Sequence, residues 1–339
     1  MSPEPRTRNE VGLAEDRHEK IKIISRADDK VVAMNLLATV ADANFVRAAK
    51  QLFASVYFNA GWRGDYMLLS AGIPESEQKW FKDRGIIVRE VDPIISEGEW
   101  ENRVPEIAIE GTSKYSVATM AKIHLLRSDF KKWRTVLYLD SDIIVRGPLS
   151  YLSRVNQFSA VKDYGKTILK QFVSPKHVPE VQPEIDKLAT KLSLESPSFN
   201  AGVFAFPTSV IEPESFTQLV SLARNNLRSA RYGDQLAWNI FFYGRWADLP
   251  RTYNYFVYYL TEMGKTVKEN RFYGAVLHFP GLDQRPWLPQ NKFYEEWSAN
   301  LNRAEEMHVS RRFRRPVIKT LKRVCHVKWS IIRHRLQGA

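Results

Sequence analysis

The sequence is poor in cysteine, in long apolar runs and, toward its end, in acidic residues. Cys325 is the only cysteine among 339 residues, so no disulfide can form within the chain, which is compatible with a reducing compartment. No run approaches the roughly 18 apolar residues of a membrane-spanning helix. Residues 1–30 are polar and lack the apolar stretch of a signal peptide. We therefore expect a cytoplasmic protein.

Acidic residues are missing after Glu306, whereas the segment 307–339 holds ten Lys or Arg residues. Because the net charge of the whole chain is +12, the part before this segment is nearly neutral. A nucleic-acid-binding body would carry a basic face of its own, so we expect no nucleic-acid partner. Within the segment, Pro316–Leu336 places apolar residues near helical spacing among basic ones. This pattern predicts an amphipathic helix on an anionic membrane surface; a solvated tail or a helix packed on the body is the alternative.

The rest of the chain has the composition and the pattern of an α/β domain. Hydrophobic residues make up 44% and charged residues 26%, as in soluble globular proteins. We expect a disordered or loosely attached arm at 1–30, a globular domain at 31–306 and the basic tail at 307–339.

Strands and helices alternate along this domain. In order, the predicted elements are a strand at Val31–Val40, a helix at Phe45–Phe58, a strand at Tyr66–Leu69, a helix from Pro74 to about Arg84, a strand at Ile86–Val91, a helix at Ser116–Phe130, flexible chain or small helices at 164–194, a strand at Ser198–Phe206 and a helix at Phe216–Leu227. Alternation of this kind implies a parallel sheet with right-handed crossovers.

The most informative stretch is Thr135–Arg146, which reads T-V-L-Y-L-D-S-D-I-I-V-R. Its apolar start is typical of a strand buried on both faces, and a D-x-D motif, Asp140 and Asp142, stands where that strand ends. Burying an ionised carboxylate without a partner is costly, and ligands bind at this end of the strands in open α/β sheets. The pair therefore suggests a cation or a metal–phosphate group. A solvated turn is the plainer explanation of an isolated D-x-D.

Three residues farther along could complete such a site. His278 follows the apolar pair Val276–Leu277 and could supply a nitrogen ligand, which Mn²⁺ accepts beside oxygen, although a lone histidine is more often structural. Gly281 would let the backbone approach a phosphate closely. Arg285 offers a bidentate phosphate contact.

Polar residues also interrupt two apolar stretches. Asn200 lies inside the predicted strand at Ser198–Phe206, where amides are depleted; either a bulge with Gly202 satisfies it or it binds a hydroxyl. Asp234 and Gln235 stand at a predicted helix start. For Asp234, an N-cap is the plain explanation.

Taken together, these motifs resemble glycosyltransferase family 8, which includes glycogenin and bacterial lipopolysaccharide galactosyl- and glucosyltransferases. The motifs are L-Y-L-D-S-D-I-I-V, F-N-A-G-V-F at Phe199–Phe204, Asp234-Gln235, and H-F-x-G followed by R-P-W, in this order over roughly residues 33–297. The resemblance implies a GT-A fold: a Rossmann-like, mainly parallel sheet flanked by helices. It also implies a UDP-sugar donor, Mn²⁺ or Mg²⁺, and transfer of a hexose with retention of configuration.

The resemblance assigns roles by position. Asp140, Asp142 and His278 would bind the metal, and Asn200, Asp234 and Gln235 would hold the transferred sugar. The donor would be bound by Asp42, Asn44 and Phe45 at the uridine, by Lys122, Asp140 and Ser141, and by Gly281 and Arg285 at the diphosphate. Two departures stand out. Phe45 replaces the usual Tyr, and Arg285 comes four residues after Gly281 where the family has a Lys after three. The alternative to Arg285 is therefore that Asp283 or Gln284 lines the site.

Mechanism and partners remain open at this level. Retention requires a covalent intermediate, for which Asp234 is the candidate carboxylate, or same-face attack, which we favour. Some bacterial members of the family carry a basic, aromatic C-terminal segment, which supports peripheral membrane attachment and a lipid-linked or glycan acceptor. The competing interpretations are a haloacid-dehalogenase-like phosphatase that uses Asp140 and Asp142, and a non-catalytic membrane-binding module.

Overall fold

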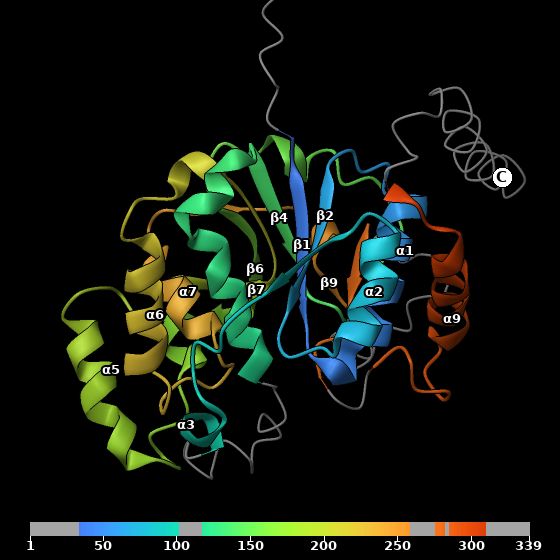
Figure 1. The fold of residues 1–339 in the computed structure, drawn as a ribbon. Coiled ribbons are helices and arrows are strands. Elements are labelled where there is room, and N and C mark those ends of the chain that lie inside the picture. The colour runs from blue at the N-terminus through green and yellow to red at the C-terminus, as the bar shows by residue number, and fades with distance from the viewer. Residues whose placement is uncertain (1–33, 102–116, 258–274, 282–284, 310–339) are drawn as a thin grey trace, which may run out of the picture. The chain divides into compact units, whose positions relative to one another are not determined.

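A mixed sheet lies at the centre of the computed structural model (Figure 1). The structure describes residues 34–101, 117–257, 275–281 and 285–309. All of them belong to one compact unit, Ala33–Ala339, and the other unit, Met1–Val32, falls outside the described residues. Within the described residues the sheet has seven strands in the order β3-β2-β1-β4-β7-β6-β8.

The first half of the sheet follows the sequence prediction closely. Its elements are β1 (Leu36–Ala41), α1 (Val46–Asn59), β2 (Asp65–Ser70), α2 (Glu75–Asp83), β3 (Ile87–Glu90) and, after a longer connection, β4 (Thr135–Leu139). β1 pairs in parallel with β2 and with β4, and β2 pairs in parallel with β3. This confirms the alternating β-α-β pattern and the mainly parallel sheet.

The second half of the sheet contains antiparallel pairs as well as a parallel one. β7 (Pro197–Pro207) runs antiparallel to β4 on one side and to β6 (Ser159–Thr167) on the other, and the two-residue strand β8 (Ala247–Asp248) pairs in parallel with β6. The motif F-N-A-G-V-F lies on β7, so it lies on the strand next to the one that leads into the D-x-D motif. The antiparallel direction is what sets Asn200 and Gly202 beside Asp140.

The helices differ from the prediction in detail. The helix expected at Ser116–Phe130 is instead two 3₁₀ segments, η2 (Val117–Leu126) and η3 (Ser128–Lys132), and α3 (Glu97–Glu101) precedes them. Residues 164–194 contain small helices, which was one of the two alternatives. These are η5 (Ile168–Gln171), η6 (Pro179–Val181) and α5 (Gln182–Ala189). The helix expected at Phe216–Leu227 is α6 (Ser215–Asn225), and it is followed by α7 (Gln235–Phe241).

A second, smaller sheet brings distant parts of the chain together. β5 (Ile143–Val145) starts directly after Asp142 and leaves the large sheet. It pairs antiparallel with β10 (Val276–His278), which also pairs in parallel with β9 (Tyr255–Phe256). In this register His278 lies opposite Ile143. The histidine of the later motif is therefore fixed next to the second aspartate of the earlier one.

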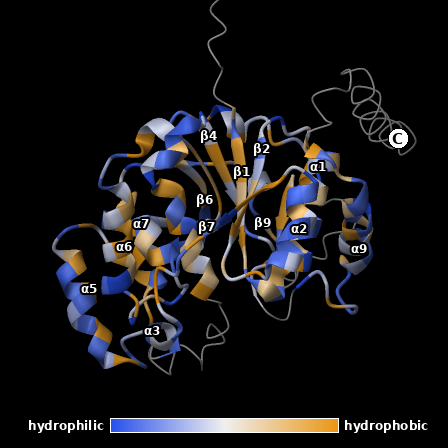
Figure 2. Ribbon diagram, viewed as in Figure 1, coloured by the Kyte–Doolittle hydropathy of each residue, from blue (hydrophilic) through white to orange (hydrophobic). Residues whose placement is uncertain are grey.

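The core occupies both faces of the large sheet. On β4, Val136 and Tyr138 belong to one hydrophobic cluster, whereas Leu137 and Leu139 belong to the other. In the same way, the residues of β1 divide between the two clusters. Figure 2 shows the hydrophobic colour concentrated on these central strands. This confirms that the strand leading to the D-x-D motif is buried on both faces.

The described chain ends against the body. After α9 (Tyr294–Arg303) and the short η10 (Ala304–Glu306), Met307 and Val309 are buried in the core, and the Val309 amide donates to the Arg84 carbonyl. Met307 and Val309 therefore pack with the body, and the boundary at residue 306 stays a prediction. The predicted tail helix, Pro316–Leu336, and the predicted arm, 1–30, lie outside the described residues.

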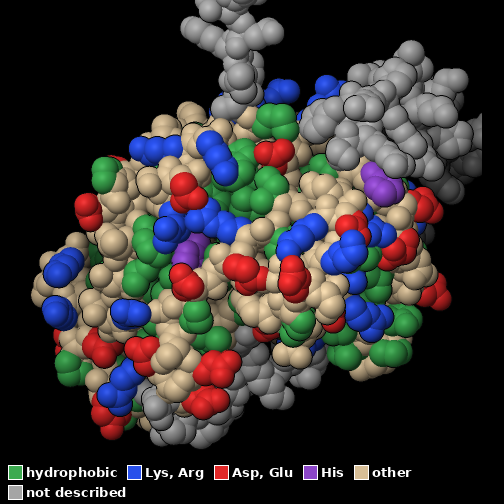
Figure 3. Space-filling view, in the orientation of Figure 1, with side chains coloured by type: hydrophobic (Ala, Val, Ile, Leu, Met, Phe, Trp, Pro, Cys, Tyr) green, Lys and Arg blue, Asp and Glu red, His purple; other side chains and the backbone are tan. Residues whose placement is uncertain are grey.

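Two surface properties complete the description. On the face drawn in Figure 3, acidic and basic side chains are interspersed, as expected for a nearly neutral body. Among the helices that the structure describes, none is both long enough and apolar enough to cross a membrane.

Candidate active site

Three predicted metal ligands converge where the two sheets meet. Asp140 follows β4, Asp142 precedes β5, and His278 ends β10. One ligand atom from each lies within 4.8 Å of the others. The His278 Nε2 atom is 3.3 Å from Asp142 Oδ1 and 3.8 Å from Asp140 Oδ2. The histidine is buried, whereas the two carboxylates remain partly accessible to a ligand.

Donors hold one oxygen of Asp140 and leave the other facing the histidine. The Tyr138 hydroxyl donates to Asp140 Oδ1 at 2.6 Å, and the Lys122 ammonium donates to the same atom at 3.3 Å. Burial, together with the nearby Asp140 carboxylate, raises the pKa of Tyr138 well above its ordinary value, so the hydroxyl keeps its hydrogen. Asp140 Oδ2 is thereby turned toward His278.

These residues fit a divalent cation. Asp142 Oδ1 is buried and has no hydrogen-bond partner among the described residues, and an unpartnered buried carboxylate oxygen is costly. Oxygen ligands with one imidazole nitrogen form a donor set that Mn²⁺ accepts. Gly202 leaves space for this arrangement, because a Cβ at that position would lie 2.4 Å from His278 Cε1 and 2.6 Å from Asp140 Oδ2.

Asp234 is not the helix cap that the plain explanation proposed. It precedes α7, but its side chain makes no capping hydrogen bond. Instead Asp234 Oδ2 lies 3.3 Å from the ammonium of Lys122. Burial raises the pKa of Asp234 to about 6, although Lys122 opposes this shift.

Lys122 is buried between the two carboxylates. Its ammonium contacts Asp140, Asp234 and the carbonyl of Ala201, the last at 3.2 Å. Two of these contacts, to Asp140 and to the Ala201 carbonyl, are hydrogen bonds, and the contact with Asp234 is an ion pair. The pKa of Lys122 is raised because its two carboxylate partners outweigh the burial that would lower it. Lys122 thus links Asp140, a predicted metal ligand, to Asp234.

Asn200 and Gln235 form the start of a buried amide network. The Gln235 side-chain oxygen accepts from Asn200 Nδ2 at 2.9 Å and from the Ala201 amide at 3.0 Å. Its nitrogen donates to Gln171 Oε1 at 2.7 Å and to Asp163 Oδ2 at 3.1 Å. The side chain of Gln235 therefore has all of its hydrogen-bonding capacity engaged by protein groups.

The residues predicted for the nucleotide lie beside an aromatic group. Asp42 accepts from the backbone amides of Asn44 and Phe45 and so caps η1 (Ala43–Phe45). The Phe45 ring contacts Trp287 edge to face, and the Arg285 guanidinium lies over both rings, 5.1 Å and 5.3 Å from their centroids. Arg285 therefore contacts Phe45, one of the three residues predicted for the uridine.

Ser141 and Gly281 were also predicted to bind the donor. Ser141 is buried between the two aspartates. Gly281 has a φ of 127° and no atom within 4 Å of a Cβ built on it, so a side chain there would be strained although the space is open. Asp283 and Gln284 lie outside the described residues.

Four residues of this site were not singled out in the sequence. Tyr138 looks like an ordinary β-former, and Asp163 and Gln171 lie in a polar stretch without a motif. Asn254, a buried asparagine before β9, accepts a hydrogen bond from His278 Nδ1 at 2.8 Å. Of the four, Asn254 alone carried a usable signal, because an amide between aromatic residues in T-Y-N-Y-F is unexpected in the same way as Asn200.

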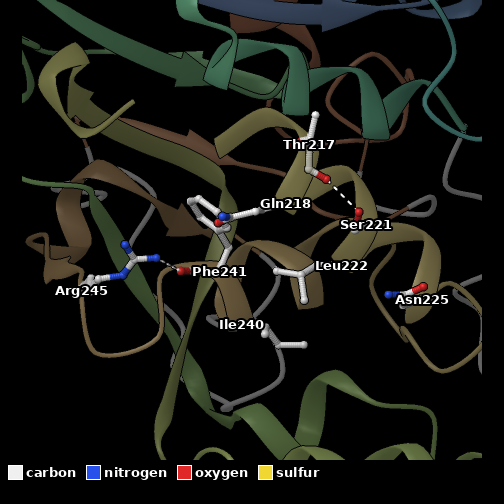
Figure 4. Close-up of a pocket in the computed structure, with 8 residues that line it drawn as sticks. All are labelled: Thr217, Gln218, Ser221, Leu222, Asn225, Ile240, Phe241 and Arg245. Atoms are coloured by element: carbon white, nitrogen blue, oxygen red, sulfur yellow. Dashed lines mark hydrogen bonds between the residues drawn. The ribbon is translucent and has the colours of Figure 1, made fainter. Parts of the chain in front are cut away.

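An open hollow of about 490 Å³ lies elsewhere, on α6 and α7. Figure 4 shows Thr217, Ser221 and Leu222 of α6 facing Ile240 and Phe241 of α7, with Arg245 at the end. None of the residues predicted for the metal, the sugar or the nucleotide lines it.

Comparison with known proteins decides the family. The model of "Glycosyl transferase family 8" matches residues 36–291, which is well over half of the chain. The chain belongs to glycosyltransferase family 8. The family membership supports a glycosyltransferase, and the α/β architecture is the GT-A fold of its structural neighbours. The family match gives no support to the phosphatase or to the non-catalytic module.

The individual relatives are distant. Galactinol synthase 4 of Arabidopsis thaliana is 23% identical over 69% of this chain and 65% of its own length. Glycosyltransferase GlyB of Streptococcus pneumoniae is 27% identical over 50% of this chain and 39% of its own length. The chain thus spans less than two thirds of these family 8 relatives.

Solved structures share the fold of this family 8 chain. The galactosyltransferase LgtC, solved in complex with donor and acceptor sugar analogues, matches with a TM-score of 0.56 at 18% identity. The match covers 79% of this chain and 95% of LgtC. The bifunctional glycosyltransferase WbbM matches with the same TM-score, over 79% of this chain and 50% of WbbM.

Proposed function

We propose that this family 8 chain is a retaining hexosyltransferase that uses a UDP-sugar donor and a divalent cation, Mn²⁺ or Mg²⁺. The observation that carries the proposal is the convergence of Asp140, Asp142 and His278 beside the cluster of Asn200, Asp234 and Gln235. A cation site next to polar side chains from β7 and the start of α7 is what a nucleotide-sugar needs. Asp42, Asn44 and Phe45 would bind the uridine, with Arg285 beside them.

Each part of the site has a chemical task in this proposal. A cation held by Asp140, Asp142 and His278 would act as a Lewis acid on the leaving diphosphate. The fixed carboxylates and amides would orient the sugar without reorganising as charge develops. Lys122 holds Asp140 and Asp234 in place through its two ion pairs. Gly281 leaves the backbone open toward a phosphate.

The hydrogen bonds favour same-face attack over a covalent intermediate. The oxygen of Gln235 accepts two hydrogen bonds from protein groups, so it would have to break one of them to attack an anomeric carbon. Asp234 is buried and held by Lys122. If Asp234→Asn retained substantial turnover with the same stereochemistry, the covalent route through Asp234 would be excluded.

A donor screen tests the proposal. The purified chain is incubated with a panel of UDP-sugars, with and without Mn²⁺, and released UDP is measured. The names of galactinol synthase and of the galactosyltransferase LgtC place a galactosyl donor first in the panel. UDP release that requires the cation supports the proposal. Phosphate release from monoesters would point to the phosphatase, and no release of either product to the binding module.

Activity should depend on the protonation of Asp234. Because its pKa is raised to about 6, Asp234 is ionised above that pH and becomes neutral below it, which weakens its ion pair with Lys122. We expect kcat/KM for the donor to fall up to about tenfold for each pH unit below 6. Rates measured between about pH 5 and pH 8, with recovery after return to neutral pH as a control for denaturation, check this. Asp234→Asn should lose this dependence; an unchanged profile in the variant would refute the assignment.

For the basic tail we propose attachment to an anionic membrane on the cytoplasmic face, with a glycan or lipid-linked acceptor there. Its support is the absence of acidic residues from 307–339 and the ten basic ones among apolar neighbours. Co-sedimentation with anionic liposomes should capture the full chain and not a chain that lacks Arg311–Ala339. Neutral liposomes serve as the control, and equal sedimentation of both chains would remove the proposal.

A further inference from the structure

Asn254 connects the metal ligands to the sugar-binding amides. It lies between η8 (Arg251–Tyr253) and β9, and it is completely buried. Its side-chain oxygen is 2.8 Å from His278 Nδ1, and its side-chain nitrogen donates to Asn200 Oδ1, also at 2.8 Å. Asn254 therefore bonds to one residue of each group.

Backbone amides determine which end of each side-chain amide faces which neighbour. The amide of Gly202 donates to Asn200 Oδ1 at 2.9 Å, and the amide of Ala201 donates to Gln235 Oε1 at 3.0 Å. A backbone N–H can only donate, so the accepting atoms of Asn200 and Gln235 must be oxygens. With the oxygen of Asn200 assigned, Asn254 must present its nitrogen to Asn200 and its oxygen to His278.

The oxygen of Asn254 in turn decides the hydrogen on His278. An amide oxygen can only accept, so Nδ1 of His278 must carry the hydrogen. In the neutral ring the other nitrogen, Nε2, then has its lone pair free to bind a metal. That nitrogen is the one facing Asp142 Oδ1 and Asp140 Oδ2. Three electron-rich atoms thus point to one position.

We infer that Asn254 is a positioning residue that fixes the metal-binding tautomer of His278 and couples the cation site to the sugar site through Asn200. The inference rests on the cation-dependent sugar transfer proposed above. A hydrogen-bonded partner on the second nitrogen of a histidine ligand orients the ring and fixes its tautomer. In this chain the same partner also fixes Asn200, so binding of the cation and binding of the sugar stabilise one arrangement.

Two substitutions separate the two bonds of Asn254. Asn254→Ala removes both of them. Asn254→Asp keeps an acceptor for His278 Nδ1 but turns a second acceptor toward Asn200 Oδ1, where the wild type has a donor. Asn200 cannot turn its amide over in response without losing its bonds to the Gly202 amide and to Gln235 Oε1. Asn254→Asp should therefore retain the metal site and damage the sugar site.

The first experiment measures Mn²⁺ alone, by titration calorimetry or by electron paramagnetic resonance of the unbound ion, without nucleotide. Asn254→Ala should lower the affinity for Mn²⁺ about 10- to 100-fold, and Asn254→Asp should leave it undiminished. In the presence of a donor that the wild type turns over, Asn254→Asp should raise the KM for that donor. The matched control is Asn239→Ala, because Asn239 is also buried and bonded to Phe199 and Gln235 but not to a metal ligand; it should bind Mn²⁺ like the wild type.

The second experiment reads the tautomer directly and needs no metal. Nitrogen-15 spectra of the histidine ring in the metal-free wild type, at about pH 8, should show His278 with its hydrogen on Nδ1. The signal is assigned by its loss in His278→Gln. A hydrogen on Nε2, or equal Mn²⁺ affinity in Asn254→Ala and the wild type, would overturn the inference. If the wild type bound no Mn²⁺ but showed the Nδ1 tautomer, the proposed function would fail and the tautomer assignment would stand.

Discussion

Asp142→Asn should reduce cation-dependent UDP release by about 10²–10³-fold, in line with the loss of one major electrostatic contact in an active site. Asp142 Oδ1 is buried, lacks a donor among the described residues and lies 3.3 Å from His278 Nε2. An amide of the same shape removes the negative charge that would bind the cation. The measurement is the initial rate of UDP release over a series of Mn²⁺ concentrations, together with the direct affinity for Mn²⁺.

The control for this variant is Asp129→Asn. Asp129 is a carboxylate in η3 that pairs with Arg89 at the surface, and its removal should leave both the rate and the Mn²⁺ requirement unchanged. An Asp142→Asn enzyme with a normal rate and a normal Mn²⁺ requirement would show that the cation is held elsewhere. The proposed function would then lose its main support.

Gly202→Ala should remove the proposed cation site and lower UDP release by at least about 10²-fold, because it crowds His278 and Asp140, the proposed metal ligands, and Asn200, proposed for the sugar. A Cβ on this residue would lie 2.4 Å from His278 Cε1, 2.6 Å from Asp140 Oδ2 and 2.9 Å from Asn200 Oδ1. None of these atoms can move away without breaking a contact of the site. Overpacking of this kind also costs about 1–3 kcal/mol of folding stability.

Stability and site loss can be distinguished for Gly202→Ala. Thermal unfolding reports the first, and Mn²⁺ affinity of the folded variant reports the second. Gly98→Ala is the matched control, because Gly98 has no atom within 4 Å of its built Cβ and lies in the short helix α3. A folded Gly202→Ala variant that bound Mn²⁺ like the wild type would contradict the geometry of the site.

Much of the fold could be predicted because the spacing of apolar residues determines whether a segment forms a strand or a helix. The apolar run before Asp140 is a strand buried on both faces, and the helical spacing after Phe45 is α1. The prediction was weaker for properties that depend on which strands pair and in which direction. Nothing in Ser198–Phe206 indicates its direction, yet its antiparallel pairing with β4 places Asn200 and Gly202 at the site. In η2, apolar residues are not confined to one face, so their spacing does not indicate a 3₁₀ segment.

The site could be predicted where side chains carry an unusual chemistry and not where they support another residue. Asp140, Asp142 and His278 could be singled out because polar groups next to buried strands are costly unless a partner compensates them. The structure brings the three side chains together. Asp234 was open to a plain explanation, helix capping, which its contact with Lys122 replaces. Asn254 was missed because its role exists only relative to His278 and Asn200, which lie far from it in the sequence.

The pairing of β5 with β10 has a consequence for how the protein is made. The ribosome releases Asp140 and Asp142 well before the strand that carries His278. The pairing of Ile143 with His278 is what brings this histidine to the two carboxylates. A nascent or prematurely terminated chain that stops before β10 would therefore contain both carboxylates but would lack His278, and it could not form the proposed three-ligand site. The three side chains would therefore come together only after β10 has been synthesised and has paired with β5.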